Sequence, residues 1–263
     1  MLLQRTMDHL KRQNWLAVVL EFLIVVFGVV VAFQLQSWGE ERAAGVRAQQ
    51  SLHQLYEESE DIVDAWAQSV RYNDKLLALQ DRVVARFSAG DRGELADDEL
   101  AEGLATISYF PTISPPRRIF DELKGAGLLR EIDAPEVLAA VSSYYEQLEF
   151  VQGQLSHFRL DTDTARDLRY GRGINYVYDG VRPVRRRIEV NFGQLVSDPV
   201  FVHALVGVLR NRIVFQSYRR QVLISAVKMC QALAAAVGEP CAPREEYDDF
   251  LELPNWQAVP DGS

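Results

Sequence analysis

An apolar stretch near the N-terminus limits what this chain can fold into more than any other feature. Residues 15–35 (WLAVVLEFLIVVFGVVVAFQL) form a run of twenty-one residues in which only Glu21 is charged. At 1.5 Å per residue, a helix of this length spans about 31 Å, which is the hydrocarbon thickness of a bilayer. Trp15 and Trp38 stand near its two ends, where indole rings act as interfacial anchors. We therefore predict a transmembrane helix over residues 15–36.

Two other interpretations of this stretch fit less well. The run exceeds the apolar core of a cleaved signal peptide, which has about 7–15 residues, and bulky or charged residues from Gln34 to Arg42 follow it instead of a small-residue cleavage site. A core helix of a globular protein would carry a polar face, which this stretch lacks. The pattern is typical of an uncleaved signal anchor.

The distribution of basic residues predicts the topology. Arg5, Lys11 and Arg12 precede the apolar run, whereas only Arg42 and Arg47 follow it closely. Positive charge is retained on the cytoplasmic side, so we expect a cytoplasmic N-terminus and an exported C-terminal part. Residues 1–14 suit an amphipathic helix at the headgroups, or alternatively a solvated tail.

The composition indicates a globular body after the anchor. The chain of 263 residues is 48% hydrophobic and 25% charged. Its net charge of −9 argues against nucleic acid as a partner, because no excess of basic residues is present to replace phosphate counterions. We divide the chain into a cytoplasmic segment (1–14), the anchor (15–36), an exported helical domain (37–243) and an acidic tail (244–263).

Most of the exported domain has helical periodicity, so we predict a mainly α fold with long helices packed as a bundle. From Glu40 to Phe87 one stripe follows three-four spacing: its members are Leu52, Leu55, Ser59, Ile62, Trp66, Asn73, Leu76, Gln80, Val83 and Phe87. Three of these ten residues are polar, which favours a bundle over an isolated coiled coil. An acidic run beside the stripe (Glu57, Glu58, Glu60, Asp61 and Asp64) is typical of a solvated face.

Helix signals continue along the chain. Residues 88–93 break the first long helix, and Asp97 or Asp98 is expected to cap a short one. A second short helix over 117–124 should end at Gly125 and Gly127. Asp133 and Asp198, each followed by an early proline, predict the starts of two further long helices, the last of which Gly238 and Pro240 should end. Residues 174–192 fit either a hairpin around Asp179–Gly180 or an irregular connector.

One face of the anchor carries the candidate contact residues. Ala17, Glu21, Gly28 and Ala32 are spaced by four, seven and four residues, which returns them to nearly the same angle of a helix. Gly28 and Ala32 permit close approach of another membrane helix. Glu21 either meets a polar group of a partner, or its own copy in a homo-oligomer, or reaches to the cytoplasmic interface and sets the depth of the span.

Two further pairings can be inferred. Cys230 and Cys241 are separated by a Gly238–Pro240 turn, so a disulfide is expected if the domain is exported, with two free thiols as the alternative. Twelve arginines against six acids lie between Arg159 and Arg220. We expect this excess to face the acidic first helix or an adjacent subunit, and the alternative places Arg185–Arg187 against anionic lipid or an acidic partner.

Residue types associated with catalysis do not form known patterns. None of the four histidines lies in an H-x-x-x-H or H-E-x-x-H motif, and His157 with Asp161 and Asp163 fits an ordinary helix face better than a metal site. Gly171–Gly173 lacks the spacing of a phosphate loop, and no G-x-S-x-G motif is present. We therefore predict no catalytic residues, no metal, no cofactor and no enzymatic activity.

The anchor resembles a known family. Its pattern E-x6-G-x3-A-x-Q-x3-W-x-E, from Glu21 to Glu40, is similar to that of bacterial single-pass membrane proteins grouped as a domain of unknown function. The segment Phe120–Leu129, with Ile132–Asp133 and Tyr144–Tyr145, resembles the family's second motif, whereas Gln36–Ser37 replaces asparagines common in the family. The resemblance implies membrane residence and a helical body, and it implies no activity.

Three functional classes follow from these observations. We favour a membrane-anchored accessory or scaffolding protein whose partners are the bilayer and either its own copy or another membrane protein. A ligand-sensing periplasmic bundle that signals laterally to a partner is the alternative, since about fourteen residues on the cytoplasmic side are too few for an output domain. The third and remote class is an envelope enzyme whose site would contain His157 and nearby acidic residues.

Overall fold

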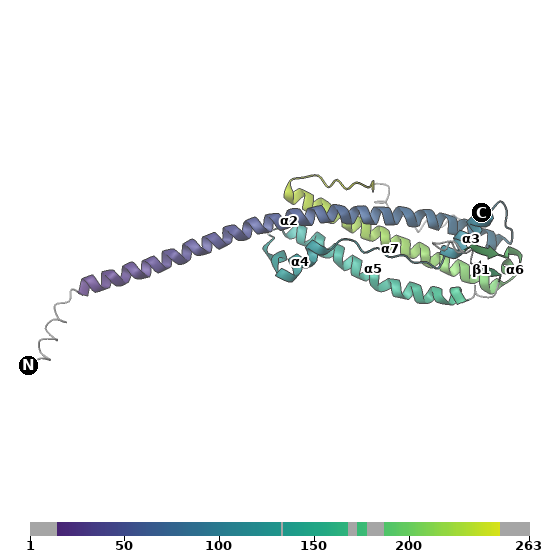
Figure 1. The fold of residues 1–263 in the computed structure, drawn as a ribbon, viewed down its shortest axis with the longest axis horizontal. Helices are drawn as coiled ribbons and strands as arrows, with labels where there is room; N and C mark the ends of the chain where they lie inside the picture. The colour runs from purple at the N-terminus through teal and green to yellow at the C-terminus, as the bar shows by residue number, and fades with distance from the viewer. Residues whose placement is uncertain (1–14, 133, 168–172, 178–186, 248–263) are drawn as a thin grey trace, which may run out of the picture. The chain divides into compact units, whose positions relative to one another are not determined.

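The computed structural model describes residues 15–132, 134–167, 173–177 and 187–247, and it confirms the mainly α fold (Figure 1). The helices are α2 (Trp15–Ala89), α3 (Asp97–Thr106), α4 (Arg118–Ala126), the 3₁₀ helix η1 (Leu128–Glu131), α5 (Pro135–Asp167), α6 (Phe192–Val196) and α7 (Pro199–Val237). The strands are β1 (Ile174–Val177) and β2 (Arg187–Val190). The amphipathic prediction for residues 1–14 and the arginines at 185 and 186 lie outside the described residues.

Contacts divide the chain into two units, Met1–Ser51 and Leu52–Ser263. The described part of the first unit is the beginning of α2, and the second unit contains the rest of α2 and every later element. The packed core of the second unit draws on residues from Leu52 onward. Residues 37–51 continue the helix without a packed core of their own among the described residues.

In the second unit α2 buries the stripe that the sequence predicts. Nine of the ten stripe residues are buried, and Leu52 is half-buried. The three polar members are buried with hydrogen-bond partners: Ser59 donates to its own helix, Asn73 donates to the Ser69 carbonyl, and Gln80 donates to Thr106. The helix ends at Ala89, one residue before Gly90 adopts a φ of 72°. Satisfied polar groups allow this stripe to form a bundle core.

The core lies between α2, α5 and α7, which run side by side in Figure 1. One cluster joins Leu55, Ile62 and Trp66 of α2 with Tyr144 and Leu148 of α5, and with residues 215–234 of α7. A second cluster surrounds Val83, Val84 and Phe87 of α2, and its other members are Leu95, Leu100, Leu104, Ile107, Ile174, Leu195, Phe201, Leu205, Val208 and Leu209.

Within the part of the chain that the structure describes, two helices are long and apolar enough to cross a membrane by length and composition alone. The first is Val19–Gly39, with a mean hydropathy of 2.2 and no buried residues in its window. The second is α7, with a mean hydropathy of 1.2 and 44% of its window buried. Because α7 supplies sixteen buried residues to the bundle, we interpret it as a core helix of the globular part.

The helix ends agree with most of the predicted signals. Asp198 caps α7, with its carboxylate accepting hydrogen bonds from the backbone N–H groups of Val200 and Phe201. Gly238 ends α7 with a φ of 81°, and Gly127 ends α4 with a φ of 75°. Gly125 lies inside α4 instead of ending it. The expected Asp133 cap of α5 lies outside the described residues.

The predicted cap of α3 was wrong. The N-cap residue is Ala96, and Asp97 is already helical. The carboxylate of Asp97 is bonded instead to Arg92, while Glu99 Oε2 accepts a hydrogen bond from the Ala96 N–H over 3.3 Å. Glu99 therefore accepts from the backbone of the N-cap residue, as the glutamate of a capping box does, while Ala96 has no side chain that caps the first turn.

Of the two alternatives for residues 174–192, strands are found. β1 and β2 pair antiparallel, with Ile174 opposite Val190 and Val177 opposite Arg187. Ile174 is buried in the second core cluster, which anchors this two-stranded sheet to the bundle. The predicted turn at Asp179–Gly180 lies outside the described residues.

Candidate functional site

The predicted membrane contact face lies in the first unit. α2 is helical throughout residues 15–39, so Glu21, Gly28 and Ala32 share one face, and all three are exposed. The backbone of Ala17 belongs to the same helix and register, while the side chains of Ala17 and Trp15 lie outside the described residues. Trp38 is exposed, and the guanidinium of Arg42 lies 5.6 Å from its ring centroid. The face is therefore continuous along the helix.

Gly28 leaves an open position on this face. A Cβ atom built at Gly28 meets no heavy atom within 4 Å. The large side chains from Val19 to Leu35 are exposed as well, so nothing in the described chain covers the span. An apolar helix left uncovered by its own protein needs a different apolar medium around it.

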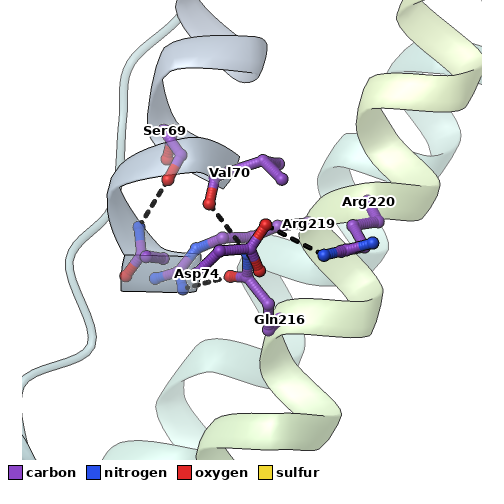
Figure 2. Close-up of polar contacts among 7 residues, drawn as sticks. Ser69, Val70, Asp74, Gln216, Arg219 and Arg220 are labelled. Carbon is purple, nitrogen blue, oxygen red and sulfur yellow. Dashed lines mark hydrogen bonds and ion pairs between the residues drawn. The ribbon is translucent and has the colours of Figure 1, made fainter. Parts of the chain in front are cut away.

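The bundle, by contrast, contains a buried polar layer between α2 and α7. Figure 2 shows Gln216 of α7 directed at α2, where its amide donates to the Val70 carbonyl over 3.0 Å and to Asp74 Oδ1 over 2.8 Å. Arg220 pairs with the other oxygen of Asp74 over 2.9 Å. These contacts fix the register of the two helices, because a shift along either axis would leave buried polar atoms without partners.

Two buried arginines complete this layer, and the side chains donate to amide and carbonyl oxygens. Arg212 donates to Gln80 Oε1 over 3.1 Å and to the Tyr109 carbonyl. Arg219 donates to the Pro111 carbonyl over 2.6 Å. Burial lowers the pKa of Arg212 to about 10, and burial together with nearby Arg212 lowers the pKa of Arg219 to about 9. The charges are stabilised by amide and carbonyl dipoles.

These arginines hold the connector between α3 and α4 against the bundle. Arg212, Arg159 and Arg219 donate to the carbonyls of three successive residues, Tyr109, Phe110 and Pro111 respectively. An extended segment ending in prolines cannot satisfy its carbonyl groups internally. Side chains from α5 and α7 supply the missing donors.

The predicted destination of the arginine excess is thus only partly correct. Arg220 does pair with Asp74 on the first long helix. Arg212 and Arg219 instead bond to neutral acceptors, because their positions on α7 face the polar stripe of α2 and the connector rather than the acidic run.

The acidic run on α2 was also wrongly interpreted as a plain solvated face. Glu58 is buried, and its two carboxylate oxygens accept hydrogen bonds from the N–H groups of Ile119 (2.8 Å) and Phe120 (3.2 Å). These N–H groups belong to the first turn of α4, where a helix favours negative charge. A glutamate distant in sequence therefore caps α4.

Two adjacent tyrosines lie beside this cap. Tyr144 Oη accepts a hydrogen bond from Trp66 Nε1 over 3.2 Å, and the Tyr145 ring stacks on Phe120 with centroids 3.5 Å apart. Burial raises the pKa of both tyrosines. Tyr145 Oη is buried and has no hydrogen-bond partner among the described residues.

Glu60, Asp61 and Asp64 of the acidic run contact the segment after α7, which we name the strap (residues 239–247). The strap is joined to α7 by the disulfide Cys230–Cys241, whose Cα atoms lie 5.7 Å apart. Arg244 pairs with Asp61 and Asp64, and the Ala242 N–H donates to Glu60 over 2.8 Å. The described part of the tail thus lies on α2.

Within the described residues, no three His, Cys, Asp or Glu side chains are placed to hold a metal ion. His157 is exposed on α5, and the side chains of Asp161 and Asp163 are outside the described set. A cavity between the long helices, lined by Trp66, Phe215 and Arg219 among others, has a volume of about 20 Å³. This is room for a single water molecule.

An open cleft of about 530 Å³ lies at the end of α2 beside α3, lined by Asp81, Arg82, Arg86, Glu94 and Glu99 among others. Its Arg82 and Glu99 are paired with each other over 2.6 Å. Both charged and apolar side chains line the cleft, which lies at the end of α2.

Comparisons with known proteins returned nothing: no family model, no curated protein and no solved structure matches this chain. The resemblance of the anchor to bacterial single-pass proteins therefore stays a prediction.

The sequence did not lead us to predict that Glu58, Arg212 and Arg219 are buried and hydrogen-bonded to other elements of the fold. A signal for Arg212 and Arg219 was present, since they lie seven residues apart on a helix and so share the face that carries Leu205 and Val222. Helical spacing does distinguish Glu58 from exposed Glu57, because Glu58 lies three residues after Leu55 and four residues before Ile62 of the buried stripe. Only the fold places the start of α4 opposite Glu58.

Proposed function

We propose that this protein is a single-pass protein of a bacterial inner membrane that acts without catalysis, as an accessory or scaffolding component. Its N-terminus is cytoplasmic and its helical bundle is periplasmic. It pairs through the Ala17, Glu21, Gly28 and Ala32 face of the span, either with its own copy or with another membrane protein, and the bundle offers further contacts to envelope partners.

The observation that carries this proposal is the exposed span. Residues 19–39 form an apolar helix with no side chain buried against the rest of the described chain. Lipid supplies the apolar surroundings that the protein itself does not. Within the span, Glu21 is the residue that lipid accommodates least well, which favours a polar contact from a partner helix.

The interior of the bundle supports a structural role. Its buried polar side chains bond to each other or to backbone groups, with Tyr145 Oη the exception among the described residues. Side chains engaged in this way position helices and are not available to a substrate. The small cavity beside Arg219 likewise lacks the room that the alternative sensing role would need for a solute.

The test is detergent pull-down of the tagged full-length protein, with mass spectrometry of what accompanies it. Glu21→Leu and Gly28→Leu should each reduce recovery of the partner at least several-fold, because one removes the polar contact and the other blocks close approach. Val30→Leu is the matched control, since it lies two residues, or about 200°, round the helix from Gly28. Its partner recovery should equal that of the wild type.

Two differently tagged copies, expressed together, separate the two kinds of partner. Capture of one tag with the other identifies a homo-oligomer, and recovery of a distinct membrane protein identifies a heterologous complex. Unchanged recovery of every partner in both Glu21→Leu and Gly28→Leu would remove the proposed contact face.

A further inference from the structure

The strap follows α2 as an extended segment. At its beginning the Tyr56 hydroxyl lies 2.9 Å from the Pro240 carbonyl oxygen, and at its end Arg71 Nη2 lies 2.8 Å from the Glu246 carbonyl oxygen. Fifteen helical residues from 56 to 71 rise about 22 Å, and six extended residues from 240 to 246 span about 20 Å. The two lengths match, so the strap runs parallel to α2, as the last coloured segment of Figure 1 also shows.

Polar contacts, some of them open to water, hold the middle of the strap, and Tyr247 at its end packs against the main core. Arg244 bonds to Asp61 over 2.7 Å and to Asp64 over 3.0 Å, yet its side chain is 81% exposed. Arg71 pairs with Glu245, and the Glu245 N–H donates to Asp64 over 2.8 Å. Ion pairs this open to water contribute little each. The covalent bond to α7 is therefore the strongest restraint on the strap.

The two sulfurs of that bond differ in access. Cys230 is fully buried in the main core of the bundle, whereas Cys241 is half-buried on the strap. A nucleophile that approaches from solvent therefore reaches Cys241 Sγ first. The side of the disulfide that is open to attack is the side that belongs to the movable segment.

We propose that the Cys230–Cys241 disulfide is a reducible latch, and that a dithiol reductant opens it and releases residues 239–247 from α2. Release uncovers Tyr56, Glu60, Asp61 and Asp64 on α2, which are the groups that the strap engages. This inference does not depend on pairing of the membrane span. It concerns a redox-controlled surface of the bundle.

The reaction takes two steps and consumes one dithiol. A thiolate of the reductant attacks Cys241 Sγ, a mixed disulfide forms there, and the Cys230–Cys241 bond breaks with its electron pair leaving on Cys230 Sγ, which takes up a proton. The second thiol of the reductant then attacks the mixed disulfide and releases Cys241 as a thiol. The reductant is oxidised to its disulfide, and the protein gains two electrons and two protons.

Once the disulfide is reduced, the strap is joined covalently to the bundle only through the backbone that follows α7. Closing a loop of this size covalently favours the closed arrangement on the order of 100-fold, and this advantage disappears on reduction. The contacts that remain between the strap and α2 include hydrogen bonds and ion pairs that are open to water, such as those of Arg244 with Asp61 and Asp64.

Amide hydrogen exchange of the full-length protein in detergent tests the latch. The Ala242 and Glu245 amides donate to Glu60 and Asp64, so their exchange should accelerate about 10- to 100-fold after reduction with dithiothreitol. The Cys230→Ser/Cys241→Ser variant should reproduce this without reductant. Exchange at Val141 and Leu148 in α5 is the internal control and should not change.

Two outcomes would overturn the latch. If alkylation shows complete reduction and the Ala242 and Glu245 amides exchange as before, the strap is held without the disulfide. If exchange in α5 accelerates equally, the disulfide stabilises the whole bundle and does not control the strap alone.

A monothiol tests the direction of attack. Incubation with reduced glutathione, followed by acid quenching and peptide mass spectrometry, should place the glutathione adduct on the peptide that contains Cys241. An adduct on Cys230 in its place would contradict the proposed order of steps.

Discussion

Arg212 of α7 donates a hydrogen bond from Nε to Oε1 of Gln80 of α2 over 3.1 Å, and both side chains are buried. The contact joins residues 132 positions apart in the chain. It places a positive charge in the bundle interior opposite a neutral amide, so the charge depends on each dipole around it.

Substitution Gln80→Leu should therefore destabilise the protein by about 2–3 kcal/mol, because it leaves a buried guanidinium N–H without its acceptor. Urea unfolding of the full-length protein in detergent, followed by circular dichroism, measures the change. Gln68→Leu is the control on the same helix, since Gln68 is exposed, and its effect should stay within about 0.5 kcal/mol. Equal stabilities of the two variants would contradict the account of the polar layer.

The carboxylate of Glu58 should prove as important for α4. Glu58→Leu removes the acceptor for the Ile119 and Phe120 N–H groups, at a cost of about 2 kcal/mol. The amides of these two residues should also exchange faster with solvent. Glu57→Leu, one residue earlier and exposed, should change neither quantity measurably. Protection at Ile119 that survives in Glu58→Leu would show that another group caps this helix.

These two contacts show which parts of the fold can be predicted from the sequence and which cannot. The stripe on α2, the Asp198–Pro199 start of α7 and the Gly238 end depend on residues close together in the chain, and they were predicted correctly. The bonding of Glu58 to α4 and of Arg212 to the connector joins residues about 60 and 100 positions apart. No local pattern reports such pairings, because topology brings the partners together.

The same distinction applies to the candidate site. Helical geometry alone predicts that Glu21, Gly28 and Ala32 share a face of the span. What occupies that face depends on molecules outside this chain. For the strap, the cysteine pair could be inferred from sequence, whereas its course along α2 could not, since Arg244 and Asp61 carry no signal of mutual contact.

The two adjacent tyrosines should respond oppositely to loss of a hydroxyl group. Tyr145→Phe should leave stability unchanged or raise it by about 1 kcal/mol, because the hydroxyl is buried without a partner. Tyr144→Phe should lower stability by about 1 kcal/mol, since it removes the acceptor of the Trp66 indole N–H. Thermal unfolding measures both. A larger loss for Tyr145→Phe than for Tyr144→Phe would mean that Tyr145 has a hydrogen-bond partner in solution.

Two glycines offer a further matched pair. A Cβ atom at Gly103 in α3 would lie 2.6 Å from Val83 Cγ2, so Gly103→Ala should destabilise the protein by about 1–3 kcal/mol through overpacking. Gly153 in α5 has no heavy atom within 4 Å of such a Cβ, and Gly153→Ala should stabilise the protein by about 0.4–1 kcal/mol. Chemical unfolding of both variants checks the signs. Effects of the same sign would be inconsistent with close packing of α3 on α2.

The central claim is that lipid surrounds residues 19–39, and extraction of native membranes at alkaline pH tests it most directly. Sodium carbonate removes peripheral proteins and leaves spanning helices in the bilayer. We predict that the full-length protein stays in the carbonate-resistant pellet, and that Val26→Arg/Val30→Arg, which places two charges in the span, shifts it to the supernatant. Recovery of the wild-type protein in the soluble fraction would contradict the account.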